Sequence, residues 1–131
     1  MKLILPPRRK DIFGCGHFGA SRGNRTHNGI DYACTPESKI FSPVEGKVTK
    51  LGYPYSDDLY FRYVQVTTKE GYNVRVFYVE PFIVVGDYVN ESVIIGASQS
   101  LDKRYPNITE HIHLEIKGVN GQFIDPQDLN L

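Results

Sequence analysis

The chain has 131 residues, with 15 basic and 15 acidic side chains and a formal net charge of zero. This length suits one compact domain that buries a core without disulfide staples. A neutral balance lacks the electrostatic signature of a dedicated nucleic-acid-binding protein. No apolar run is long enough for a membrane helix, and the N-terminal segment has too short an apolar core for a signal peptide. We therefore expect one domain over residues 1–131, with an N-terminal arm at 1–12, synthesised in the cytoplasm without a membrane span.

Two local features near the N-terminus carry simple interpretations. The basic run Arg8-Arg9-Lys10 is interpreted as a solvated part of the arm. Cys15 and Cys34 can form at most one disulfide, and neither belongs to a C-x-x-C pair. Buried free thiols and a single bridge are therefore both favoured over metal ligation.

Short strand-like segments bounded by Gly, Pro, Asn or Asp recur along the chain, and helical periodicity is weak. In residues 72–79, alternation places the even-numbered residues, including Tyr78, on one face and the odd-numbered residues, including Val79, on the other. Lys69-Glu70-Gly71 is interpreted as a hairpin turn in which glycine supplies the positive φ. The fold class predicted is all-β, built from antiparallel strands. The strands are expected at residues 29–34, 39–41, 46–51, 59–68, 72–79, 82–85, 93–95 and 111–116.

The four histidines of the chain are His17, His27, His111 and His113. The strand period of two sends His111, His113 and Glu115 to one face, while the intervening apolar residues face a core. Two neighbouring imidazoles can converge on one cation, or one can bind metal while the other carries a proton. Glu115 is a candidate to orient one of them from behind.

A second cluster is His27-Asn-Gly-Ile-Asp31, in which an imidazole and a carboxylate flank a glycine that lets the backbone turn. Zn²⁺ accepts such nitrogen and oxygen ligands, and three protein ligands leave a fourth position for water. The alternatives are that His27 caps a turn, that Asp31 only begins a strand, and that the H-x-H histidines are half-buried core residues.

The order of motifs resembles the lysostaphin-type zinc metallopeptidases, which cut glycyl or stem-peptide bonds in peptidoglycan. The motifs are Phe13-Gly14 with Arg22, the segment 25–33, the strand pair at 40–48, the G-D-x-V turn at 85–96, the H-x-H with Glu115, and Asp125-Pro126. The resemblance implies antiparallel sheets that form a groove. It also implies one Zn²⁺ held by His27, Asp31 and His113, with His111 as an acid–base or transition-state-stabilising residue.

The family usually carries a further histidine in a Y-x-H strand motif, where this chain has Glu80. The segments Gly14-Cys15-Gly16, F-Y-x-x-P at 77–81 and the loop 98–109 resemble the leukocyte chemotaxin branch, whose secreted vertebrate members keep zinc and are regarded as non-proteolytic. A carboxylate beside zinc can accept a proton from water. Glu80 is therefore either a substitute catalytic base or an exposed carboxylate at a strand end.

The function expected is zinc-dependent cleavage of peptidoglycan peptides, with His111 and Glu80 as catalytic residues. A phage virion or tail is the expected setting, with other virion proteins as partners at the bacterial wall. The main alternative is an inactive, zinc-stabilised binding or structural protein, and a weaker one is a phosphocarrier-like β-domain. His17 is interpreted as a surface loop residue, with a contact to substrate as the alternative.

Overall fold

The computed structural model describes residues 5–8, 11, 14, 16–20 and 27–128 of the chain. These residues form a nearly all-β domain, as the sequence predicts, with one short 3-10 helix, η1, at Pro126–Asp128. The strands are β1 (Ile30–Ala33), β2 (Lys39–Phe41), β3 (Gly46–Gly52), β4 (Tyr63–Thr67), β5 (Asn73–Phe77), β6 (Val79–Pro81), β7 (Tyr88–Val89), β8 (Ile94–Ser98), β9 (His111–Lys117) and β10 (Phe123–Ile124).

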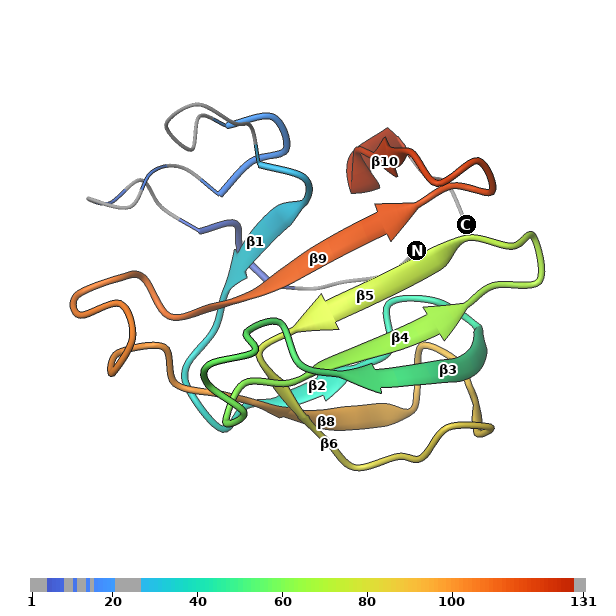
Figure 1. Ribbon diagram of the computed structural model, residues 1–131, viewed down its shortest axis with the longest axis horizontal. Coiled ribbons are helices and arrows are strands. Elements are labelled where there is room, and N and C mark those ends of the chain that lie inside the picture. The colour runs from blue at the N-terminus through green and yellow to red at the C-terminus, as the bar shows by residue number, and fades with distance from the viewer. Residues whose placement is uncertain (1–4, 9–10, 12–13, 15, 21–26, 129–131) are drawn as a thin grey trace.

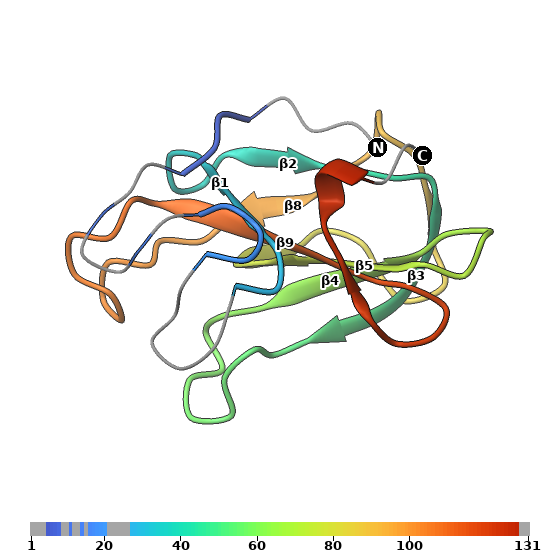
Figure 2. The ribbon, with the colours of Figure 1, turned by 90° about the horizontal axis from the view of Figure 1, so that it is seen from above.

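The strands form two antiparallel sheets (Figure 1). The larger, seven-stranded sheet has the order β1-β9-β5-β4-β3-β7, and β10 also pairs with β9. The smaller sheet has the order β2-β8-β6. Figure 2 shows β2 and β8 on one side of the molecule and β3 and β4 on the other. In the part of the chain that is described, no helix is long and apolar enough to cross a membrane.

The hydrophobic core combines side chains of both sheets. Ile112, Leu114 and Ile116 of β9 are fully buried in it, together with valines of β4 and β5 and with Ile40 and Ile95 of the smaller sheet. The predicted alternation of β9 is therefore confirmed, because its other face carries His111, His113 and Glu115 away from this core. Burial of one face fixes the register of β9, since a slip of one residue would exchange the two sets.

One predicted turn is confirmed, while two predicted strands need correction. The hairpin turn before β5 is confirmed, since Gly71 has φ 91° and its N–H donates to the Thr68 carbonyl at 2.9 Å. Residues 82–85, however, form no strand. The Val84 N–H donates to the Asp87 carboxylate at 3.0 Å instead, and Val84 is 63% exposed, so this apolar run lies in a turn. Residues 59–62 likewise precede β4 instead of belonging to it.

The alternation predicted for residues 72–79 breaks at Tyr78. This residue has φ 68°, in the left-handed region that non-glycine residues rarely adopt. From this residue on, the side chains point to the faces opposite to those predicted. Val79 is therefore fully buried in the core, while Tyr78 turns to the opposite side, beside Phe77. Pure period-two reasoning cannot anticipate such an interruption.

The N-terminal arm also differs from its prediction. The Arg8 N–H donates to the Asp31 carbonyl at 2.9 Å, and Pro7 forms an isolated bridge with Tyr32, so this part of the arm runs along β1. The side chain of Arg8 is only 3% exposed. The interpretation of Arg8 as a solvated residue is therefore wrong, because its charge is matched by carboxylates inside the fold. Arg9 and Lys10 lie outside the described residues.

Candidate metal centre

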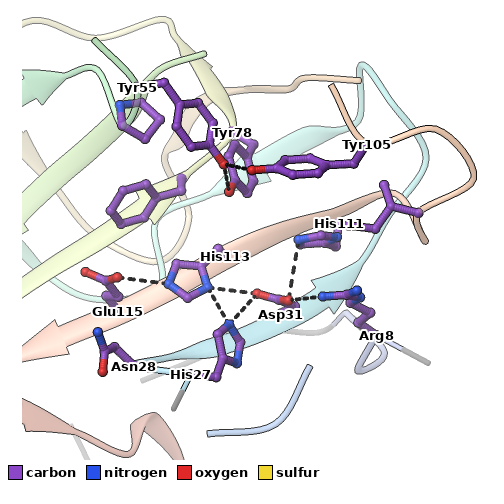
Figure 3. A pocket seen from close by; sticks show the side chains of 13 residues that line it. Arg8, His27, Asn28, Asp31, Tyr55, Tyr78, Tyr105, His111, His113 and Glu115 are labelled. Atoms are coloured by element: carbon purple, nitrogen blue, oxygen red, sulfur yellow. Dashed lines mark hydrogen bonds and ion pairs between the residues drawn. The ribbon is translucent and has the colours of Figure 1, made fainter. Parts of the chain in front are cut away.

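Three potential ligand atoms meet at one point of the large sheet (Figure 3). His27 Nε2 lies 3.0 Å from His113 Nδ1 and 3.0 Å from Asp31 Oδ1, and His113 Nδ1 lies 2.8 Å from the same Asp31 oxygen. Zinc ligands lie about 2.0–2.2 Å from the metal, so atoms on one face of its tetrahedron are roughly 3.3 Å apart. The triangle is slightly smaller than that face, and small rotations of the side chains would open it.

The strand register explains why these residues meet. Asp31 of β1 pairs directly with His113 of β9, and His113 pairs on its other side with Phe77 of β5. Directly opposite residues place their side chains on the same face of a sheet. His27 approaches from the segment before β1, where its own N–H donates to the Ala20 carbonyl at 2.8 Å.

Gly29 allows the segment before β1 to pass close to β9. A Cβ on this residue would collide with the Leu114 carbonyl and would lie 2.9 Å from His113 Cε1. The φ of Gly29 is not positive, so this glycine serves close approach more than the turn that the sequence suggested. The same close approach holds His27 within reach of His113.

In His27 and His113, the outer ring nitrogen, which faces away from the triangle, has a hydrogen-bond partner that orients the ring. His27 Nδ1 lies 3.0 Å from the His17 carbonyl, to which it can only donate. His113 Nε2 lies 3.0 Å from Glu115 Oε1. A proton held on each outer nitrogen leaves the inner nitrogen with the lone pair that a metal requires. The donor set and these hydrogen bonds therefore fit one Zn²⁺.

The charges of the centre are strongly coupled. Burial raises the pKa of Asp31, but hydrogen bonds with His113 and His27 outweigh it and hold this pKa well below its ordinary value. Burial lowers the pKa of His113, but hydrogen bonds with Asp31 and Glu115 outweigh it and raise the pKa to about 9. In the absence of metal, a carboxylate and an imidazolium thus stabilise each other at neutral pH.

His111 lies next to this triangle with a different protonation preference. Its Nδ1 is 2.6 Å from the Thr109 carbonyl, and its Nε2 is 3.4 Å from Asp31 Oδ2. Burial lowers the pKa of His111, and this effect exceeds the opposing attraction of Asp31. His111 is therefore neutral at pH 7, with its proton on Nδ1 and the Nε2 lone pair facing the centre.

Tyrosine hydroxyls line the opposite side of the same cavity, which has a volume of about 380 Å³. The Tyr55 hydroxyl lies 2.8 Å from that of Tyr78 and 2.7 Å from that of Tyr105, and Figure 3 shows the three converging. The Tyr78 ring packs edge-on against His111, with centroids 5.7 Å apart. Burial raises the pKa of Tyr55 to about 12 and that of Tyr78 well above 10, so both hydroxyls keep their protons.

The remaining predicted residues lie elsewhere. Glu80 is an exposed residue of β6 and is not among the described residues that line the cavity. The His17 side chain is exposed, and only its backbone carbonyl supports His27. Cys34 is a half-buried free thiol whose pKa is raised by burial, which agrees with the free-thiol alternative. Cys15 lies outside the described residues.

Among the residues that line the cavity, sequence reasoning missed the arginine of the arm and the tyrosines, namely Arg8, Tyr55, Tyr78 and Tyr105. Arg8 stood in a basic run that favours solvent. Tyr55 and Tyr105 belong to loops, for which periodicity predicts nothing. For Tyr78, the F-Y-x-x-P segment was a signal, but strict alternation assigned its side chain to the wrong face.

Residues 25–126 match peptidase family M23, a span that includes all three residues of the candidate metal centre. The chain belongs to this family. Leukocyte cell-derived chemotaxin-2 of Mus musculus is 31% identical to this M23 domain over 108 residues, which cover 82% of the chain and 71% of that protein. The similarity to this relative agrees with the chemotaxin-like segments of the sequence.

Solved structures share the fold of this M23 domain. One is the antimicrobial peptidase lysostaphin from Staphylococcus simulans, with a TM-score of 0.64 and 22% identity, covering 78% of this chain and 42% of lysostaphin. Another is a mutant catalytic domain of the prophage-encoded M23 protein EnpA from Enterococcus faecalis, with a TM-score of 0.66 and 20% identity, covering 94% and 95%. The chain thus spans less than half the length of lysostaphin, and both likenesses concern the fold alone.

Proposed function

We propose that this M23 domain is a zinc-dependent endopeptidase that hydrolyses peptide bonds of bacterial peptidoglycan. The observation that carries the proposal is the triangle of His27 Nε2, Asp31 Oδ1 and His113 Nδ1, with a hydrogen-bond acceptor behind each imidazole. Three protein ligands are typical of catalytic zinc, because a fourth position remains for water. A buried neutral histidine beside the triangle supplies the group that such hydrolysis needs in addition.

Bound zinc would polarise the scissile carbonyl and lower the pKa of a water molecule. In the proposed reaction, His111 Nε2 accepts the proton of the attacking water and delivers it to the leaving amine. The Thr109 carbonyl keeps the other ring nitrogen protonated, so Nε2 is the available base. The imidazolium formed in this way lies 3.4 Å from Asp31 Oδ2, which stabilises its charge.

This assignment gives His111 the role of proton acceptor that the sequence suggested for Glu80. The hydroxyl of Tyr78 lies on the cavity wall beside His111 and stays protonated, so it is a suitable donor to the oxyanion of a tetrahedral intermediate. The Tyr55 hydroxyl is hydrogen-bonded to the hydroxyls of both Tyr78 and Tyr105, and these two bonds hold the three hydroxyls in place.

The substrate and the setting are inferred from proteins that share the fold. Similarity to lysostaphin, an antimicrobial peptidase, and to a prophage-encoded M23 protein favours a wall peptide as substrate and a phage virion or tail as carrier. In that setting, the domain would be made in the cytoplasm, would assemble with other virion proteins and would act at the bacterial cell wall.

Release of dye-labelled fragments from purified peptidoglycan tests the proposal. Zinc-loaded protein is expected to release fragments, while a chelator or the variant His111→Ala is expected to reduce release by a factor of about 100 or more, the usual range for a group that transfers a proton. The variant should still bind one zinc, which separates lost chemistry from lost structure. Undiminished release by His111→Ala would contradict the mechanism.

A zinc-stabilised binding or structural protein is the second candidate. The exposed position of Glu80 and the 31% identity to chemotaxin-2 favour it. It predicts about one equivalent of zinc, a lower melting temperature after chelation and no hydrolysis of any wall preparation. The fragment-release assay therefore distinguishes the two candidates directly.

A further inference from the structure

Arg8 reaches the centre from a part of the chain that lies outside the matched span of the family. Its backbone is held against β1 by the bond from its N–H to the Asp31 carbonyl, and the Ala33 N–H donates to the Pro6 carbonyl at 2.7 Å. The arm thus adds backbone pairing at the outer edge of β1, beside the residue that supplies the carboxylate of the metal centre.

The guanidinium of Arg8 divides its donors between two carboxylates. One terminal nitrogen donates to Asp31 Oδ2 at 2.8 Å. The other donates to Asp11 Oδ1 at 2.6 Å, and Nε donates to Asp11 Oδ2 at 3.2 Å. Such a fork of planar donors fixes the orientation of its partners, which a lysine cannot do in the same way.

Asp31 uses its two oxygens for different purposes. Oδ1 faces His27 and His113, while Oδ2 accepts the bond from Arg8. The side chains of Arg8 and Asp31 are each 3% exposed, so this ion pair is little screened by water. An arginine in this position favours the orientation in which Oδ1 points at the histidines.

The contact between the arm and β1 depends on a glycine. A Cβ on Gly16 would lie 2.7 Å from the Arg8 Cβ and 3.0 Å from the Asp31 Cβ. The Asp31 N–H also donates to the Gly16 carbonyl at 2.7 Å. The close approach that places Arg8 over Asp31 is therefore part of the packed fold.

The same cluster supports the segment that leads to β9. Asp11 Oδ2 accepts the Thr109 N–H at 2.9 Å, and the Thr109 carbonyl is the partner of His111 Nδ1. Thr109, whose carbonyl orients His111, is thus held through its N–H by the carboxylate that also holds Arg8.

We propose that Arg8 is a positioning residue that, together with Asp11, orients Asp31 Oδ1 toward the metal and links the N-terminal arm to Thr109, the residue whose carbonyl contacts His111. The inference rests on the metal site of the proposed function, and does not require hydrolysis.

Zinc affinity measured by competition with a chromophoric chelator tests this role. Arg8→Gln is expected to lower the affinity about 10- to 100-fold, the range for loss of a partner behind a metal ligand. It should also alter the visible absorption of the cobalt-substituted protein, because Asp31 Oδ2 loses its bond from the Arg8 guanidinium. Arg8→Lys should recover part of the affinity, since it keeps a charge but lacks the fork. Arg62→Gln is the matched control, because that arginine stacks on Tyr53 and does not line the cavity.

Wild-type affinity and an unchanged cobalt spectrum in Arg8→Gln would overturn the inference. If Arg8→Gln does not fold, the variant Asp11→Asn tests the inference instead. Its zinc affinity is expected to be lower than that of the control by threefold or more, and a wild-type affinity would contradict the inference. Failure of the wild-type protein to bind zinc would instead refute the proposed function, so the two failures are distinguishable.

Discussion

Asp31 and His113 are directly paired across the β1–β9 ladder, and His113 Nδ1 lies 2.8 Å from Asp31 Oδ1. The pair serves two exclusive purposes. Without metal, it is an ion pair that stabilises the fold, whereas metal binding requires the same nitrogen to lose its proton. This competition makes zinc affinity depend on pH.

We expect zinc affinity to rise with pH between about 6.5 and 9. The pKa of His113 is raised to about 9, so at neutral pH zinc must displace one proton from it. The affinity should increase about tenfold per pH unit in this range and level off above it. Calorimetry in buffers of different ionisation enthalpy should detect release of about one proton per zinc at pH 7. An affinity independent of pH would contradict the assignment of His113 as a ligand.

The raised pKa of His113 predicts the opposite trend for the stability of the metal-free protein. A pKa raised on folding contributes stability that is complete below the unfolded value near 6.5 and is lost as pH rises through the folded value. The melting temperature in the presence of chelator should therefore fall between pH 6.5 and 9, and Asp31→Asn should remove this contribution.

Two glutamate variants test whether Glu115 or Glu80 contributes to zinc binding. Glu115→Gln is expected to weaken zinc binding about 10- to 100-fold, because Glu115 holds the outer nitrogen of His113. Glu80→Gln is expected to leave zinc binding and any hydrolysis unchanged, because Glu80 is exposed on β6. Chelator competition and fragment release measure both. A large loss in Glu80→Gln alone would restore Glu80 as a functional residue.

Gly29→Ala should destabilise the domain and disturb the metal centre together. The added methyl would collide with the Leu114 carbonyl and crowd His113, at a cost of about 1–3 kcal/mol in the free energy of unfolding. Denaturant unfolding measures this loss. Gly118→Ala is the control, because its nearest neighbours are side-chain ends of Ile124 and Gln122 that can move. Equal effects of the two variants would argue against a special role for the approach at Gly29.

Tyr78→Phe separates stability from catalysis. Loss of the hydrogen bond to Tyr55 should cost about 1 kcal/mol of stability. If the hydroxyl donates to an oxyanion, kcat should fall by about 100-fold with little change in KM. Tyr88→Phe, at a side chain that is 80% exposed, is the control. Unchanged kcat in an active protein would limit Tyr78 to a packing role.

The sequence by itself determined the all-β class, the alternation of β9 and the residues of the candidate metal centre. Periodicity sufficed for β9 because residues 112, 114 and 116 are buried, which specifies the opposite face for His111, His113 and Glu115. The order of the motifs indicated the other two residues of the centre, because it assigned His27 and Asp31 to the same cluster as His113 before any distance was known.

Only the tertiary structure decided which other groups surround that centre. The left-handed backbone at Tyr78 sends its hydroxyl to the cavity and leaves Glu80 outside, against the alternation of the strand. The pairing of the arm with β1 brings Arg8 to Asp31 across 23 positions of sequence. Both features arise from packing between distant segments, and local propensity carries no information about such contacts.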